Sequence, residues 1–438
     1  MIRVSCVTVT TTPRHSETLM QIICFEDSFV KRLQPITLSR PAYAITCASL
    51  RLIEWLKLLP GDINVSVRDF LADIEKLDSG MSAPTNCNDS DGVLLVNARL
   101  VPRVGVLETL QAIAKSEKSV CVMDPEDDVV LIAKITAADL NTNRETLDKA
   151  ECLSKSLREI ARTFASPEST ETIAVFRWPH DVVQNHMNEM PDAMMWRLAQ
   201  GGYTETTDGL FVGEGVQLGE YAVVDTSEGP ILLDDNVQVG PFCFLSGPVY
   251  AGPGTRIIEH AALKDGVALG HTVKIGGEVE ASVIEPFSNK QHHGFLGHSY
   301  SGSWINLGAG TCNSDLKNTY GKINIQYGDN KVATGMQFLG CIMGDYSKTA
   351  INTSIFTGKV IGVCSMLYGF ATSNVPSFVN YARLFGQESL LPAEVMINTQ
   401  QRMFSRRKVE QRECDKQLIR DMYRHTASER DAVDQYGL

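Results

Sequence analysis

The chain has little of what several classes of protein require. Its eleven cysteines are scattered and include no C-x-x-C pair, which argues against a disulfide scaffold and against a zinc cluster. No apolar run is long enough to span a membrane. Basic residues are in the minority, with 40 Lys and Arg against 52 Asp and Glu, and the net charge of −12 opposes a broad nucleic-acid-binding surface. The composition predicts a cytoplasmic protein with reduced thiols, whose partners are neither nucleic acid nor membrane.

The first residues also lack the apolar segment that a secretory signal needs. Residues 1–19 are polar and rich in threonine, and a β-like apolar run begins only at Met20. We interpret this stretch as a disordered or misassigned leader. Both Met1 and Met20 remain open as the start of translation.

What the sequence does contain is an unbroken repeat of six residues. A strand alternates with a period of two and a helix with about 3.6, so a period of six predicts a coil of short strands with three flat sides. Four positions after each aliphatic residue stands a small or β-branched one, which suits a narrow interior. The period breaks at 281–295 and again at about 312–335, where we expect loops that leave the coil. The aliphatic column is Leu233, Val239, Leu245, Ala251, Ile257, Leu263, Leu269, Ile275 and Ala281.

The sequence before the coil alternates apolar strand candidates with helical stretches, which predicts an α/β domain with a largely parallel sheet. The expected strands are 21–25, 92–96, 119–123 and 129–134, and the expected helices are 44–58, 67–77, 103–115 and 145–164. The predicted order is a leader (1–19), the α/β domain (20–170), a connector (171–209) with a helix near 192–200, the coil (210–375) and a helical tail (376–438).

Two polar clusters lie where the repeat is interrupted. The run NKQHHGFLGH at 289–298 holds three of the nine histidines of the chain, and a neutral imidazole can accept a proton from an attacking amine or hydroxyl. The run NLGAGTCNSDLKN at 306–318 has glycines that let a ligand approach the backbone, and Lys317 and the nearby Lys322 can meet phosphates. These clusters are the strongest candidates for a site on the coil.

The longer run NKQHHGFLGHSYSGSWINLGAGTCNSDLKNTYG resembles the acetyltransferase core of the alternative bacterial GlmU-type family. That family joins a putative sugar nucleotidyltransferase to a hexapeptide-repeat acyltransferase. The segment Phe25-Glu26-Asp27, with Leu33, Pro35, Thr37, Arg40 and Pro41, resembles the family's opening, and Asn97-Ala98-Arg99 resembles a later segment. The resemblance covers Met20 to about Arg407 and implies a left-handed parallel β-helix that assembles as a homotrimer.

By this resemblance, the reaction is acetyl transfer from acetyl-CoA to the amine of glucosamine 1-phosphate, and His292 is the general base. The resemblance makes Lys264, Lys290 and Asn313 candidates for substrate binding and Lys317 a candidate for coenzyme binding. One departure is His293, which stands where the family has an acidic residue. If that position orients the base, the change weakens catalysis or shifts its optimum pH.

The α/β domain departs further from the better-known branch, because no G-x-G-T-R-M run follows its first strand. The family resemblance assigns Lys31 and Arg40 to nucleotide binding, and Glu26 and Asp27 to Mg²⁺, for synthesis of a nucleoside diphosphate sugar such as UDP-N-acetylglucosamine. Alternatively, the two carboxylates cap a turn or helix. The domain would then bind a sugar nucleotide weakly or only support the trimer.

Each assignment on the coil has a structural alternative. His293 and His298 are expected to be structural, and Lys264, Lys274 and Lys290 are as well explained by solvated surface charges. The arginines near Arg402, Arg406 and Arg407 suit a solvated helix face, and Trp178 to Asp181 suits a hinge or a nucleotide contact. For the whole chain, the alternatives are a non-catalytic β-helical assembly scaffold and an acyltransferase that acts on another amino sugar.

Overall fold

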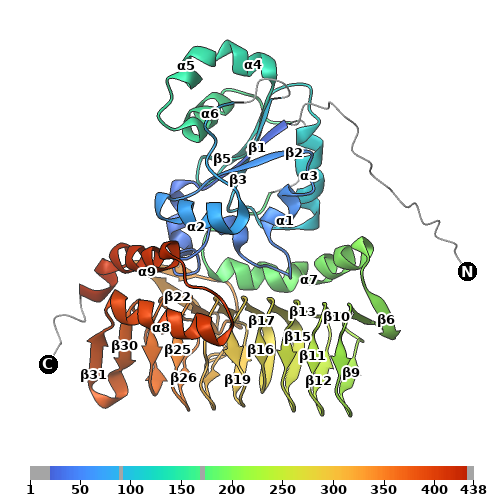
Figure 1. Cartoon of the computed structure of the whole chain (residues 1–438), viewed down its shortest axis with the longest axis vertical. Helices are drawn as coiled ribbons and strands as arrows, with labels where there is room; N and C mark the ends of the chain where they lie inside the picture. Colours follow the sequence, from blue (N-terminus) through green and yellow to red (C-terminus); the bar gives the residue numbers. More distant parts are fainter. Residues whose placement is uncertain (1–19, 88–91, 168–172, 432–438) are drawn as a thin grey trace, which may run out of the picture.

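The computed structural model describes residues 20–87, 92–167 and 173–431, so the predicted leader lies outside the described residues. An α/β domain sits on one side of a long β-solenoid, and two carboxyl-terminal helices lie against both (Figure 1). No helix among these residues is long and apolar enough to cross a membrane. The arrangement confirms the predicted fold class of an α/β domain, a hexapeptide-repeat β-helix and carboxyl-terminal helices.

The α/β domain contains a mixed sheet, which corrects the prediction of a largely parallel one. The strand order is β2-β1-β3-β5-β4. β1 pairs in parallel with β2 and β3, whereas β5 pairs antiparallel with β3 and β4. The link between β4 and β5 is a short turn, and a parallel pair would need a longer crossover. The strands are β1 (Met20–Phe25), β2 (Gly61–Ser66), β3 (Val93–Asn97), β4 (Val120–Asp124) and β5 (Val129–Ile135).

The helices predicted at 67–77 and 103–115 lie within two residues of those bounds, whereas the other two predicted helices are divided. The expected helix at 44–58 is interrupted where Ala48 and Ser49 have φ of 51° and 75°, a left-handed conformation that a helix does not tolerate. The expected helix at 145–164 divides into α5 and α6. The helices are η1 (Ser28–Leu33), η2 (Ala42–Ala44), α1 (Leu52–Leu56), α2 (Asp69–Ser79), α3 (Val104–Ala114), α4 (Ala137–Thr142), α5 (Arg144–Asp148) and α6 (Leu153–Ala161).

Helix α7 (His180–Gln200) joins the domain to the solenoid and begins well before the predicted start near Asp192. It lies between the two, as Figure 1 shows, and packs on β15, β17 and β20. Its buried His186 accepts a hydrogen bond from the Ala48 amide (3.0 Å) and donates one to the Gly266 carbonyl (3.0 Å). The connector is therefore a structural bridge between the two parts.

The solenoid has about 10 turns of parallel strands. All nine residues of the predicted aliphatic column are buried in its interior, as the six-residue period requires. The hairpin strand β6 (Thr204–Thr207) pairs antiparallel with β7 at its start. The solenoid strands are β7 (Leu210–Val212), β8 (Gln217–Leu218), β9 (Val223–Asp225), β10 (Ile231–Leu233), β11 (Gln238–Val239), β12 (Phe244–Ser246), β13 (Val249–Ala251), β14 (Arg256–Ile257), β15 (Ala262–Leu269), β16 (Lys274–Ile275), β17 (Glu278–Ile284), β18 (Asn289–Lys290), β19 (Phe295–Gly297), β20 (Tyr300–Ser301), β21 (Cys312–Asn313), β24 (Cys341–Met343), β25 (Lys348–Thr349), β26 (Ser354–Ile355), β27 (Lys359–Ile361), β28 (Met366–Leu367), β29 (Phe370–Ala371) and β30 (Val379–Ala382).

Only the second predicted interruption is a loop that leaves the coil. At 281–295 the chain stays in the solenoid, because β18 continues the ladder of β16 and β19 continues that of β17. Within 312–338 a hairpin of β22 (Asn324–Tyr327) and β23 (Asn330–Ala333) extends outward. Its Tyr327 stacks on Trp178 with ring centroids 5.2 Å apart.

The solenoid ends later than the predicted boundary at 375, since β30 pairs in parallel with β28 and antiparallel with β31 (Gln387–Leu390). Helix α8 (Ala393–Arg406) then crosses one solenoid face, and α9 (Glu413–His425) packs against α2 (Figure 1). Apolar side chains from all three parts share one cluster beneath these helices. The tail thus fastens the α/β domain to the solenoid.

Candidate functional site

His292 lies at a corner of the solenoid, between β18 and β19, with an exposed side chain. Within the described residues, its ring has no hydrogen-bond partner, so both nitrogens are accessible to a substrate. The preceding residue, Gln291, lines a cavity of about 300 Å³ on the adjoining face. His292 itself is not among the residues that line this cavity, and its exposure at the corner is compatible with the predicted general base.

Lys290 holds the loop that carries His292. Its ammonium donates to the carbonyl oxygens of Gly276 (2.7 Å), Gly294 (2.7 Å) and His292 (3.3 Å), and the side chain is buried. Burial lowers the pKa of Lys290 to about 8. All three donors are used by the backbone, so the structure gives Lys290 a supporting role in place of the predicted substrate contact.

Replacement of Lys290 by Met should therefore destabilise the protein and distort the His292 loop. Three carbonyls would lose a charged donor, and we expect a loss of about 1–3 kcal/mol in the free energy of unfolding together with lower kcat. Denaturant unfolding measures the stability, and kinetics of the predicted acetyl transfer measure kcat, with Lys264→Met as the matched control. If Lys290→Met raised only the KM for the sugar phosphate and left stability unchanged, the substrate contact would be correct.

The other predicted contacts on the solenoid also have protein partners. Lys264 forms ion pairs with Glu278 (2.8 Å) and Glu280 (3.6 Å) on the surface. Asn313 is buried, where it accepts from the Gly297 amide (2.9 Å) and donates to the Gly297 carbonyl (3.0 Å). Lys264 and Asn313 therefore join neighbouring turns, which does not support their predicted substrate contacts.

Lys317 differs because it is partly exposed and, among the described residues, forms no ion pair. Its ammonium donates one hydrogen bond, to the Lys322 carbonyl (2.5 Å), and keeps other donors available. The predicted contact between Lys317 and the coenzyme is therefore compatible with its position.

A second imidazole of the 289–298 run, His298 between β19 and β20, has a partner that the sequence analysis missed. His298 Nδ1 lies 2.9 Å from Asp315 Oδ2, and the ring stacks on Phe338 with centroids 5.1 Å apart. A carboxylate that accepts a hydrogen bond from one ring nitrogen fixes the orientation of an imidazole. The two residues are 17 positions apart, about one turn of the coil, and this spacing was the available signal.

In the α/β domain, both carboxylate oxygens of Glu26 accept hydrogen bonds from the protein. Its carboxylate accepts from the Ala42 amide (3.0 Å), and from the Arg68 amide (3.0 Å) and Nε (2.9 Å). This geometry fixes the loop after β1 onto the start of α2. It does not support the predicted role of Glu26 as a metal ligand.

The carboxylate of Asp27 likewise has its partners within the protein. It forms an ion pair with the fully buried Arg99 (2.8 Å), accepts from Asn97 Nδ2 (2.8 Å), and caps η1 through the Phe29 amide (2.9 Å). Across the described residues, no group of three or more His, Cys, Asp or Glu side chains is arranged to hold a metal ion. The predicted Mg²⁺ ligands therefore do not fit, and the capping alternative describes Asp27 better.

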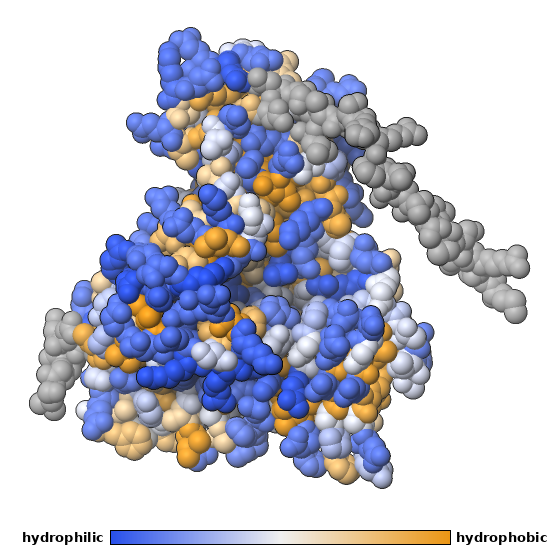
Figure 2. Space-filling model, viewed as in Figure 1, coloured by the Kyte–Doolittle hydropathy of each residue, from blue (hydrophilic) through white to orange (hydrophobic). Residues whose placement is uncertain are grey.

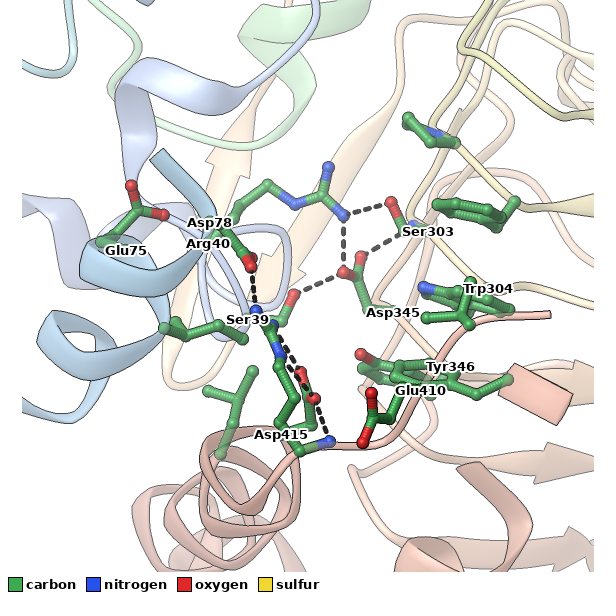
Figure 3. Close-up of a pocket in the computed structure, with 17 residues that line it drawn as sticks. Ser39, Arg40, Glu75, Asp78, Ser303, Trp304, Asp345, Tyr346, Glu410 and Asp415 are labelled. Carbon is green, nitrogen blue, oxygen red and sulfur yellow. Dashed lines mark hydrogen bonds and ion pairs between the residues drawn. The ribbon is translucent and has the colours of Figure 1, made fainter. Parts of the chain in front are cut away.

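Arg40 joins the two domains instead of facing a nucleotide. Figure 3 shows it directed toward Ser303 and Asp345 of the solenoid, at distances of 2.9 Å and 2.5 Å. Its other terminal nitrogen lies 3.2 Å from Glu285. Lys31 is exposed and lines a separate cavity of about 600 Å³ beside Trp178, so this member of the predicted nucleotide pair is the one without an ion pair to the solenoid.

Known proteins resemble this chain in parts. Residues 22–195 match the family model described as sugar nucleotidyl transferase. The Bifunctional protein GlmU of Cupriavidus pinatubonensis is 35% identical over 115 residues, which are 25% of this chain and 24% of that protein. The chain is similar to GlmU-type bifunctional proteins. The predicted family resemblance is thus confirmed, although the chain spans about a quarter of the length of that GlmU relative.

A second relative and one solved structure also match parts of the chain. The bifunctional sugar-1-phosphate nucleotidylyltransferase/acetyltransferase of Sulfurisphaera tokodaii is 28% identical over 149 residues, covering 34% of this chain and 37% of that one. The solved structure of the Arabidopsis UDP-N-acetylglucosamine acyltransferase has 14% identity and a TM-score of 0.23, covering 44% of this chain and 74% of that one. So low a TM-score adds nothing to the functional argument.

Proposed function

We propose that the solenoid transfers an acetyl group from acetyl-CoA to the amine of glucosamine 1-phosphate. The observation that carries the proposal is the position of His292, which is exposed at a solenoid corner within a motif that resembles the GlmU-type acetyltransferase core. The partial similarity to a protein named as a bifunctional sugar-1-phosphate nucleotidylyltransferase/acetyltransferase supports acetyl as the transferred group and a sugar 1-phosphate as the class of substrate.

In this reaction the amine nitrogen attacks the thioester carbonyl carbon. The new N–C bond forms, the C–S bond breaks, and the coenzyme leaves as a thiolate. His292 accepts the proton that the amine loses, and that proton is then available to the thiolate. Lys290 contributes indirectly, because its hydrogen bonds to the backbone hold the loop that presents the imidazole.

The proposed active form is a homotrimer. Along the same solenoid corner as His292, the rings of Tyr221, Phe242 and His260 stack with centroids 5.1 Å and 5.3 Å apart. Tyr221 is 71% exposed and Phe242 is 53% exposed. Exposed aromatic rows of this kind favour contact with another protein surface, and a second copy would also enclose His292.

For residues 22–195 we propose sugar nucleotide chemistry, with formation of UDP-N-acetylglucosamine as the coupled activity. The family-model match supports this, and Lys31 remains the accessible basic contact for a nucleotide phosphate. Because Glu26 and Asp27 are paired with arginines, no step is assigned to Mg²⁺ at these residues. Cytoplasmic location is part of the same proposal.

The test is a substrate panel on the purified full chain. Thiol release from acetyl-CoA should require glucosamine 1-phosphate and should fall sharply with glucosamine 6-phosphate or with longer acyl chains. Pyrophosphate release from nucleoside triphosphates and N-acetylglucosamine 1-phosphate tests the α/β domain separately. If the folded protein released no thiol from acetyl-CoA with any amino sugar, the scaffold alternative would be favoured.

A further inference from the structure

The sheet edge of the α/β domain that is suited to ligand binding faces the solenoid. Strands β1, β2 and β3 are parallel, and in open α/β sheets ligands bind beyond the carboxyl ends of such strands. The segment 26–46, which we name the β1 loop, follows β1 at this edge, and its Arg40 and Thr46 contact Glu285 of the solenoid. On the face shown in Figure 2, the lower part of the α/β domain and the solenoid form one continuous surface. A ligand at this edge would therefore meet both parts.

Two buried carboxylates of the solenoid hold the β1 loop in place. Asp345 accepts hydrogen bonds from Ser39 and from Arg40 (2.5 Å), and Figure 3 shows both side chains directed toward it. Glu285 accepts from the amide (2.9 Å) and from the hydroxyl (2.9 Å) of Thr46. Arg40 also lies 3.2 Å from Glu285, so one guanidinium joins the two carboxylates. Because charged hydrogen bonds are among the strongest polar contacts, the solenoid fixes the position of this loop.

The β1 loop and the solenoid also share a cavity of about 600 Å³. Lys31 and Arg32 line it from the loop, and Tyr327 and Asn330 line it from the hairpin of β22 and β23. The hairpin is held close to the α/β domain, because Tyr327 accepts a hydrogen bond from the His180 amide (3.1 Å). The walls of this shared cavity therefore come from both parts of the chain.

The loop side of the shared cavity is basic. Arg32 forms an ion pair with Asp127 (2.8 Å), whereas the exposed Lys31 forms none among the described residues, so its ammonium is available to an anion. The one carboxylate among the described lining residues is Glu429, and it accepts a hydrogen bond from the Ser377 amide (2.8 Å). This side of the cavity favours a phosphate group.

The hairpin side suits the base and the sugar of a nucleotide. Trp178 and Tyr327 stack with their rings nearly parallel, and both line the cavity. Asn330 is exposed, and its side chain has no hydrogen bond within the described part of the chain. A free amide can donate to and accept from a base or a hydroxyl group. The cavity therefore combines a phosphate contact with groups that can recognise the rest of a sugar nucleotide.

We propose that the solenoid completes a sugar-nucleotide site of the α/β domain in the shared cavity. Lys31 contacts the diphosphate, and Asn330 is a specificity-determining residue that contacts the base or the sugar. Asp345 and Glu285 are positioning residues, because they hold the loop that carries Lys31. The proposal rests on the proposed function, since the ligand is the product expected of residues 22–195. It adds that the chemistry of the α/β domain depends on side chains of the solenoid.

The first experiment measures binding on the full chain, without chemistry. UDP-N-acetylglucosamine is titrated by calorimetry, and uridine is the phosphate-free comparison. Asn330→Ala should bind the sugar nucleotide about 3- to 10-fold more weakly, as expected when neutral hydrogen bonds are lost. The matched control is Asn324→Ala, since Asn324 is exposed on the same hairpin and does not line the cavity. The control should bind as the unmodified chain does.

The positioning residues need a readout that loss of stability alone would not change. Asp345→Asn keeps the shape of the side chain but removes the charge that pairs with Arg40. It should weaken binding of the sugar nucleotide about 3- to 10-fold, while kcat and KM for acetyl transfer stay within about threefold. Arg40→Lys should bind more tightly than Arg40→Met, because a lysine can still pair with one carboxylate. Circular dichroism checks that each variant is folded.

The inference is overturned if Asn330→Ala binds as tightly as Asn324→Ala, if Asp345→Asn leaves the affinity unchanged, or if uridine binds as tightly as the sugar nucleotide. Pyrophosphate release separates it from the proposed function. A chain that binds UDP-N-acetylglucosamine but releases no pyrophosphate from UTP and N-acetylglucosamine 1-phosphate would uphold the shared site and reject the coupled activity. An active chain whose KM values are unchanged by Asn330→Ala would reject the shared site alone. If the unmodified chain neither bound the sugar nucleotide nor released pyrophosphate, both would be rejected.

Discussion

Replacing His292 by Gln should lower kcat for acetyl transfer by about 10²- to 10⁴-fold, the usual range for loss of a general base. The amine must lose a proton as it attacks the thioester, and a glutamine amide cannot accept one. Because the His292 side chain is exposed and has no partner among the described residues, thermal unfolding should not change. Steady-state kinetics with acetyl-CoA and glucosamine 1-phosphate measure the effect.

Two other histidines make this prediction specific. His425→Gln is the matched control, because His425 is an exposed residue at the end of α9 that packs on Phe70, and its loss should leave kcat within about threefold. His298→Gln tests the competing imidazole that Asp315 orients. If His298→Gln abolished transfer while His292→Gln did not, the general base would be His298.

Replacing Arg99 by Met should destabilise the α/β domain by about 3–5 kcal/mol, as expected when one partner of a buried ion pair is removed. Arg99 is fully buried and bonds both oxygens of Asp27, and it also lies 3.5 Å from Asp127. Without the guanidinium, the Asp27 carboxylate would remain buried without its counter-charge. Urea unfolding, followed by tryptophan fluorescence, to which Trp55 and Trp178 contribute, measures the loss.

Arg162→Met is the control for this change, since Arg162 and its partner Asp128 have side chains 37% and 80% exposed. An exposed ion pair contributes about 0–1 kcal/mol, so this variant should unfold almost as the unmodified chain does. Equal unfolding midpoints for the two variants would contradict the account of the Arg99 network. Such a result would again favour the hypothesis that Asp27 is a metal ligand.

The solenoid was predictable because its repeat can be recognised within a short stretch of sequence. A period of six places each aliphatic side chain inside without reference to distant sequence, and every residue of the predicted column is buried. The edge strand β2 (Gly61–Ser66) was missed because polar and apolar residues alternate along it. Most of its residues are only half-buried, so it lacks a continuous apolar run. The antiparallel pairing of β5 was missed because strand direction depends on connections that apolar patterns do not encode.

The site was less predictable, because charge partners come from distant parts of the chain. Nothing in the motif indicates that Lys290 is enclosed by three carbonyls, or that Arg40 meets Asp345 across a domain boundary. Asp27 and Arg99 are likewise paired only by the fold. His292 was identified through the motif alone, and the structure adds its exposure at a corner of the solenoid.

The most direct test of the account is the mass-spectrometric identification of the product from acetyl-CoA and glucosamine 1-phosphate. The unmodified chain is predicted to form N-acetylglucosamine 1-phosphate and free coenzyme A in equal amounts, and His292→Gln is predicted to form neither above the uncatalysed background. Absence of the acetylated sugar with the unmodified chain, or equal formation by the folded His292→Gln variant, would contradict the account.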